Sequence, residues 1–170
     1  MANELDIKWI RLTEVLNDFA DAFIQNARDN LQANQSNASY NLYNSFEKII
    51  EVGEDYFKVS ISLADYWQFL ERGRGPGKFP PLDKIRDWID VKPVNPEPLS
   101  NGKIPSVEQL SFLIGRKIAN EGTEGRPFFE PAKEQTIREF EERINMAIEE
   151  DVSNFILELV EKGMRDTFSK

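Results

Sequence analysis

The sequence predicts an α+β fold: a small antiparallel β-sheet packed by a long N-terminal helix and a long C-terminal helix, with extended loops. Helix-period apolar stripes near both ends of the chain and one alternating apolar segment between them support this prediction. The 170 residues match the usual size of one domain, and 40% of them are apolar, enough for a hydrophobic core. We therefore expect residues 1–170 to form a single domain.

The N-terminal helix is predicted over residues 5–31, where apolar residues recur at spacings of three and four. We interpret this stripe as core, and binding of a partner helix is the alternative. The polar residues 32–39 are expected to end the helix as a loop. The stripe consists of Trp9, Leu12, Leu16, Phe19, Phe23, Ala27 and Leu31.

A β-hairpin is predicted next in the chain. Residues 55–64 alternate between apolar and polar side chains, which is the period of a strand with one buried face. A weaker strand precedes it at residues 45–52. The turn between the two antiparallel strands is assigned to Gly53, Glu54 and Asp55.

Three further helices are predicted before the C-terminal one. The first spans residues 65–72, and the second has Pro80 and Pro81 at its start. Residues 90–105 form a proline-rich extended loop. The third helix begins at Ser106, which has the capping-box spacing to Gln109, and ends before Gly122.

The long C-terminal helix is predicted over residues 131–168, after a short strand at Phe128–Phe129. A helix of this length exceeds about 45 Å, more than a small sheet covers, so part of it must project or meet another subunit. Its predicted stripe is Ile137, Phe140, Ile144, Ile148, Val152, Phe155 and Leu159.

Composition excludes several kinds of site. The chain has no cysteine and no histidine, which removes disulfides, thiolate zinc sites and the commonest general base. The adjacent acids Glu141–Glu142 and Glu149–Asp151 are interpreted as a solvated helix face. We expect no enzymatic activity, no cofactor and no metal. We also expect a soluble protein, because the chain has neither a signal-peptide pattern nor an apolar run of membrane-spanning length.

Residues 72–81 form what we name the basic arm, RGRGPGKFPP, in a chain whose net charge is −9. The arm does not match a P-loop, because Arg72 and Phe79 stand where glycine and a hydroxyl residue are required. Its glycines permit bends and its prolines stiffen it, which suits a segment that lies across another surface. The alternative is an ordinary exposed turn with Phe79 folded back on Trp88.

The order of the motifs resembles the tail-completion and head–tail joining proteins of tailed bacteriophages. The segments ASYNLYNSF, DYWQFLERG and ANEGTEGRPFFEPA follow one another with the spacing of that family. Tyr40 replaces the glycine of the first motif, and Trp67 replaces the usual alanine of the second. The matching residues are Tyr66, Phe69, Glu71 and Gly73 in the second motif, and Gly125, Pro127, Phe128, Pro131 and Ala132 in the third, which Arg126 also suits.

The resemblance implies a structural virion protein, a ring-forming subunit of the phage neck or tail top. The implied partners are further copies in a hexameric or dodecameric ring and other neck, portal-adaptor or tail proteins. Genomic DNA would pass through the lumen without specific binding, and no membrane is involved. The protein would reside in the virion, and in the host cytoplasm during assembly. The implied subunit interface contains Arg72, Arg74, Lys78, Phe79, Arg126, Phe128 and Phe129.

The charge pattern is compatible with this role, and it leaves one alternative. Residues 130–170 carry 11 acidic and 6 basic residues, so an acidic helix could face the basic arm of a neighbouring copy. The alternative is a DNA-binding regulatory or packaging-associated protein that uses the basic arm as its phosphate contact.

Overall fold

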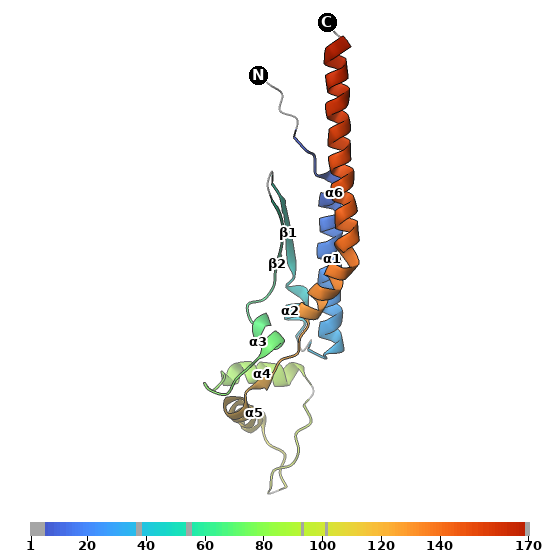
Figure 1. Cartoon of the computed structure of the whole chain (residues 1–170). Helices are drawn as coiled ribbons and strands as arrows, with labels where there is room; N and C mark the ends of the chain where they lie inside the picture. The colour runs from blue at the N-terminus through green and yellow to red at the C-terminus, as the bar shows by residue number, and fades with distance from the viewer. Residues whose placement is uncertain (1–5, 37–38, 54–55, 93, 101, 169–170) are drawn as a thin grey trace. The chain divides into compact units, whose positions relative to one another are not determined.

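The computed structural model describes residues 6–36, 39–53, 56–92, 94–100 and 102–168 (Figure 1). The predicted α+β class is confirmed, with long helices at both ends and a small antiparallel sheet. The chain forms two compact units, each assembled from separate segments and described here by itself. Unit 1 contains Met1–Ala27, Glu47–Ser62 and Pro131–Lys170; unit 2 contains Arg28–Phe46 and Leu63–Glu130.

Unit 1 is built on an antiparallel pair of helices, α1 (Ile10–Ala33) and α6 (Phe129–Phe168) (Figure 1). Asp18 of α1 pairs with Arg143 of α6 at 2.6 Å, and Asn26 donates to the Thr136 hydroxyl at 3.0 Å. Both predicted helices are therefore confirmed, although α1 begins at Ile10 rather than at residue 5.

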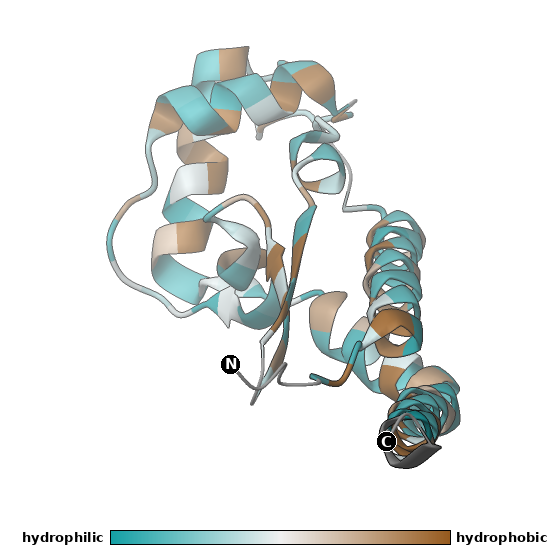
Figure 2. Ribbon diagram, turned by 90° about the horizontal axis from the view of Figure 1, so that it is seen from above, coloured by the Kyte–Doolittle hydropathy of each residue, from teal (hydrophilic) through white to brown (hydrophobic). Residues whose placement is uncertain are grey.

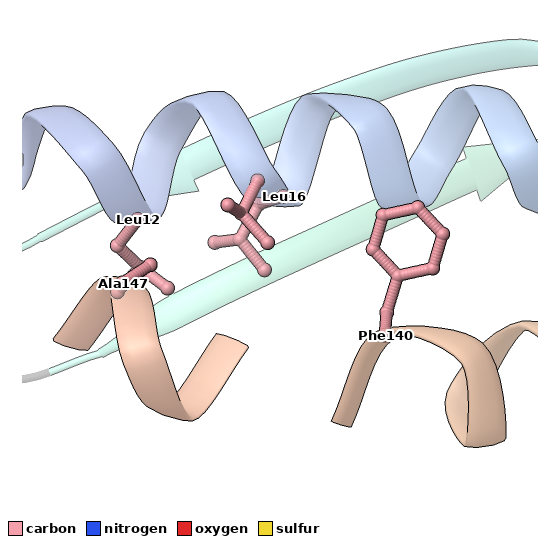
Figure 3. Packing of buried hydrophobic residues seen from close by; sticks show 5 residues of the cluster. Leu12, Leu16, Phe140 and Ala147 are labelled. Atoms are coloured by element: carbon pink, nitrogen blue, oxygen red, sulfur yellow. The ribbon is translucent and has the colours of Figure 1, made fainter. Parts of the chain in front are cut away.

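The core of unit 1 lies between these two helices and the hairpin. Figure 3 shows Leu12 and Leu16 of α1 facing Phe140 and Ala147 of α6. Removing such side chains from water stabilises the fold by about 1.5–3 kcal/mol for each large one. Further partly buried hydrophobic residues surround this cluster: Trp9, Phe19, Ala22, Ile50, Val52, Val59, Ile144 and Ile148.

The predicted hairpin is confirmed as strands β1 (Glu47–Val52) and β2 (Phe57–Ser62). The strands pair antiparallel from Glu47 opposite Ser62 to Val52 opposite Phe57. Each is shorter than predicted, and the expected turn residues Glu54 and Asp55 lie outside the described residues.

The predicted apolar stripe of α6 is only partly correct. Phe140 is buried, but Ile137 is 47% exposed and Leu159 is 42% exposed. The fully buried positions next to Phe140 are instead small residues, because a short side chain permits close approach of a neighbouring helix. The buried residues of α6 in unit 1 are Ala132, Thr136, Phe140, Ala147 and Asp151.

The last turns of α6 carry several exposed apolar residues. At about 1.5 Å per residue, the 40 residues of α6 span about 60 Å, whereas the 24 residues of α1 span about 36 Å. Figure 2 shows hydrophobic and hydrophilic residues interleaved along α6 toward the C-terminus. α6 therefore continues beyond α1, as expected, and its contact with another subunit remains a prediction. The exposed apolar residues after Asp151 include Ile156, Leu157, Leu159, Val160 and Met164.

Unit 2 contains the short helices and a second pair of strands. Helix α4 packs against α5, and Ile85 of α4 is buried. Helix α4 begins directly after Pro81, as predicted, and α5 begins after Ser106 with the complete capping box to Gln109. The elements are α2 (Asn41–Asn44), α3 (Trp67–Arg72), β3 (Gly73–Arg74), α4 (Leu82–Val91), α5 (Val107–Glu121) and β4 (Thr123–Glu124).

The predicted proline-rich loop and the predicted stop at Gly122 agree with the structure. The described residues of the loop after α4, 94–100 and 102–106, lie in no helix or strand. Gly122 ends α5 with φ 79°, a conformation that favours glycine, and its N–H donates to the Ile118 carbonyl at 2.9 Å.

Candidate interface site: a buried carboxylate and the basic arm

Glu71 is a buried carboxylate in the last turn of α3, with only 6% of its surface exposed. Its Oε2 accepts hydrogen bonds from the backbone N–H groups of Phe128 at 2.8 Å and Phe129 at 2.9 Å. Its Oε1 accepts a third from the N–H of Glu130 at 3.1 Å. These N–H groups stand at the start of α6, where they lack partners within the helix and where the helix dipole favours a negative charge. Glu71 thus caps α6 from a distant part of the sequence.

Two glycines allow the segments around this cap to approach closely. Gly73, with φ 74°, pairs with Glu124 in the β3–β4 ladder, and a Cβ atom there would lie 2.2 Å from the Thr123 carbonyl oxygen. A Cβ on Gly125 would lie 2.5 Å from the Glu71 carbonyl oxygen. No larger residue fits at either position without a backbone shift.

A backbone hydrogen bond joins the same two segments. The N–H of Arg126 donates to the Leu70 carbonyl at 2.7 Å. The structure therefore brings together the segments DYWQFLERG and EGRPFFEPA, which are separated by about 50 residues of sequence.

Aromatic packing completes the junction. Phe128 is fully buried and meets Phe46 edge-to-face, with ring centroids 6.5 Å apart. Trp67 stacks on Phe129 at a centroid distance of 4.8 Å and an interplanar angle of 29°. Such contacts stabilise a fold beyond simple burial of area. Trp67, the residue that departs from the family pattern, therefore has a packing role of its own.

This geometry corrects two expectations. The strand predicted at Phe128–Phe129 is wrong, because Phe129 begins α6 and the short strand lies earlier, at β4. Phe128 has no exposed surface, so it is a core residue of unit 2 and not a contact residue for a second subunit. Phe129 is half-buried, whereas Arg126 is exposed and donates to the Asn34 carbonyl at 3.2 Å.

The basic arm is held in shape by contacts with α5 and within itself. The N–H of Gly77 donates to the Ala119 carbonyl at 2.8 Å, and the Arg74 guanidinium donates to the Lys78 carbonyl. Phe79 packs on α5, where its ring lies against Gly115 and 5.7 Å from the centroid of Phe112. The alternative in which Phe79 folds back on Trp88 is therefore replaced by packing on α5.

Two cations of the arm remain available to a partner. Arg72 and Lys78 are exposed, and neither has an ion pair within the part of the chain that the structure describes. Arg74 is half-buried and is engaged by the arm itself. Of the predicted interface residues, the structure therefore leaves Arg72, Lys78, Arg126 and the partly exposed Phe79 at the surface of unit 2.

The charge of the protein is divided unequally between the two units. The segments of unit 1 contain 19 acidic and 10 basic residues, which accounts for the whole net charge of −9. The segments of unit 2 contain 11 of each and are neutral. The basic arm thus belongs to the neutral unit, and the excess of acidic residues belongs to unit 1.

A second buried carboxylate, Asp151, caps α1. Its oxygens accept hydrogen bonds from the N–H groups of Arg11 at 3.0 Å and Leu12 at 2.9 Å, and the residue is 4% exposed. The interpretation of Glu149–Asp151 as one solvated face is therefore correct for Glu149 and Glu150 and wrong for Asp151. No sequence signal separates Asp151 from its acidic neighbours.

Substitution of Asp151 is expected to destabilise unit 1. Asp151→Asn removes the charge that faces the N-terminus of α1 and leaves an amide donor beside backbone donors, at a cost of about 2 kcal/mol in the free energy of unfolding. Urea denaturation followed by circular dichroism measures the loss. The matched control Glu149→Gln changes an exposed acid two residues away and should stay within about 0.5 kcal/mol of the wild type. Equal stabilities of the two variants would contradict the capping role of Asp151.

The described residues contain no group of three or more acidic, cysteine or histidine side chains arranged to hold a metal ion. They also contain no helix long and apolar enough to cross a membrane.

Comparisons with known proteins identify no family. No protein-family model matches the chain, and searches among curated proteins and solved structures gave no match.

Proposed function

We propose that the protein is a structural virion protein, a ring-forming subunit of the neck or tail top of a tailed bacteriophage, which joins the head connector to the tail. The observation that carries this proposal is the junction at Glu71. The two segments with the more specific family motifs meet there, and Glu71, Gly73, Gly125 and Phe128 each have a definite role in it. Matching residues that contact one another in the folded chain support the family resemblance more strongly than isolated matches in the sequence would.

The surface of unit 2 also supports a role in assembly. A closed ring of more than two copies requires two different, complementary patches on each subunit. The rigid basic arm and the strongly acidic unit 1 are of opposite charge, which steers association and sets its register. A ring with a net negative charge would also repel the passing DNA, so that the genome slides through the lumen.

The place of the chain in phage particles tests the proposal. Particles of the phage that encodes it should carry an epitope-tagged copy at the junction of head and tail, seen by electron microscopy with a gold-labelled antibody. Removal of the gene should leave unjoined heads and tails. Normal infectious particles that lack the protein would refute the proposal.

The alternative function, DNA binding through the arm, predicts a different result. A phosphate-binding arm would give duplex DNA affinity at low salt that falls steeply as salt is added. We expect the acidic chain to show no such binding in a filter-binding or anisotropy titration at 50 mM salt, a low-salt condition. Salt-dependent binding that disappears on Arg72→Ala with Lys78→Ala would favour the alternative.

A further inference from the structure

Unit 1 has a groove where the start of α1 meets α6. It has a volume of about 640 Å³ and is lined by residues 8–14 on one side and 150–161 on the other. Its apolar lining includes Ile10 and Leu157, which are 63% and 60% exposed. Exposed aliphatic side chains beside a hollow are typical of a surface that another chain covers.

The charged side chains of the groove leave it with an excess of negative charge. Five carboxylates and two cations line it, for a formal net charge of −3. Arg11 lies between Glu14 at 2.8 Å and Glu150 at 3.5 Å. The hydrogen bond that Arg11 donates to Glu14 raises the pKa of Arg11 most, followed by the charge of Glu150.

The remaining acids lie further along α6. Lys8 pairs with Glu158 at 3.6 Å. Glu161 lies at the end of the groove and has no ion pair among the residues that the structure describes. A groove whose own cations are already engaged therefore still offers an acid to a cation from another chain.

The basic arm has the complementary properties. Residues 72–81 contain three basic and no acidic residues, and the exposed part, Gly75–Lys78, includes Pro76 as an apolar contact. The arm is rigid before it binds, because the Gly77 N–H bonds the Ala119 carbonyl and Phe79 packs on α5. Little conformational entropy would then be lost on binding.

We propose that this groove of unit 1 receives the basic arm of a second copy of the chain, with Lys78 directed at Glu161 and Pro76 at the rim formed by Ile10 and Leu157. The proposal rests on the proposed function, since it names the two patches that a ring requires. Groove and arm are different surfaces, so each copy inserts its arm into one neighbour and receives the arm of another in its groove. The contact is therefore head-to-tail. Such contacts close into a ring when the rotation between neighbouring copies allows it.

Engineered cysteines test the contact directly, because the native chain has none. A mixture of Lys78→Cys and Glu161→Cys chains, oxidised under mild conditions, should form a disulfide-linked dimer that contains one chain of each kind. The mixture of Lys78→Cys with Glu141→Cys, an exposed acid of α6 outside the groove, is the control. We expect at least tenfold more dimer from the first mixture, and equal yields would overturn the proposal.

Charge reversal gives an independent readout. Lys78→Glu, introduced in every chain, should abolish self-association measured by analytical ultracentrifugation, and the double variant that also carries Glu161→Lys should restore it. Failure of the second change to restore association would overturn the pairing of Lys78 with Glu161. A chain that carries both Lys78→Cys and Glu161→Cys gives a further check. If it forms the disulfide within a single copy, the groove is filled by the chain's own arm and not by that of a second copy.

These outcomes separate the inference from the proposed function. If the tagged protein lies at the head–tail junction but the cysteine pair does not cross-link, the function stands and this interface is wrong. If the pair cross-links but the particles contain no copy of the chain, the interface stands and the phage role is wrong.

Discussion

Replacing Glu71 by alanine is expected to lower the free energy of unfolding by about 3 kcal/mol, because buried hydrogen bonds to a charged group are among the stronger ones in proteins. Three N–H groups at the start of α6 would lose their acceptor together, and the hydrogen bond from Phe128 is buried. Urea denaturation monitored by far-ultraviolet circular dichroism measures the change. Trp67 stacks on Phe129 next to the cap and is one of three tryptophans that contribute to the near-ultraviolet dichroism, which should also change.

Two further variants distinguish the effect of losing the Glu71 cap from the effect of removing an acidic side chain in general. Glu71→Gln keeps the shape and one acceptor oxygen, so we expect it to lose less stability than Glu71→Ala. Glu124→Gln changes an exposed acid in the same unit and should stay within about 0.5 kcal/mol of the wild type. If Glu71→Ala were as stable as Glu124→Gln, the three hydrogen bonds at the start of α6 would have no energetic role.

The cap also connects stability to assembly. Glu71 is followed directly by Arg72 and Gly73, so the residue that anchors α6 also fixes the point from which the basic arm leaves α3. A rigid origin keeps the arm in one direction, which a register-specific contact needs. Loss of the cap is therefore expected to weaken association of copies even where the chain stays folded.

The elements that the sequence predicted well have signals within one element. The spacing of Leu12 and Leu16 in α1, the alternation around Val59 and the Ser106–Gln109 capping box each depend on residues a few positions apart. Amphipathic periods and helix caps involve residues that are close in sequence, so a short segment is enough to predict them. The α+β class follows from these elements alone.

The parts that the sequence did not predict depend on residues far apart in the chain. Glu71 and Phe128 are separated by 57 positions, and Asp151 lies 139 positions from Leu12, so no window reveals either cap. The buried face of α6 was missed for another reason. It uses Ala132, Thr136 and Ala147, whereas a search for large apolar residues selects Ile137, which is exposed.

The interface residues show the same division. The basic arm was recognised from its composition, and the structure leaves Arg72 and Lys78 exposed. The resemblance implies that Phe128 lies in a subunit interface, but its partner is Phe46 of the same unit. Whether an aromatic residue packs inward or outward depends on what else the fold brings to it, and the sequence contains no local signal for that.

Gly73→Ala is expected to have the largest effect of any single substitution in the arm, a loss of more than about 3 kcal/mol in the free energy of unfolding. The residue has φ 74° and ψ −168°, a combination essentially restricted to glycine. A Cβ atom would also lie 2.2 Å from the Thr123 carbonyl oxygen and 2.6 Å from the Gly125 nitrogen, and both are backbone atoms that cannot rotate away. Separation of β3 from β4 would relieve the clash, at the cost of the Gly73–Glu124 pairing.

The matched control is Gly75→Ala, two residues further along the same arm. A Cβ on Gly75 meets nothing within 4 Å, so this change should leave stability within about 0.5 kcal/mol of the wild type. The two variants add the same methyl group to the same segment and differ only in what that group would meet. Thermal unfolding measured side by side therefore separates the effect of the β3–β4 junction from that of a methyl group added elsewhere in the arm. A small, equal effect in both would mean that the junction yields easily and does not hold the arm to the start of α6.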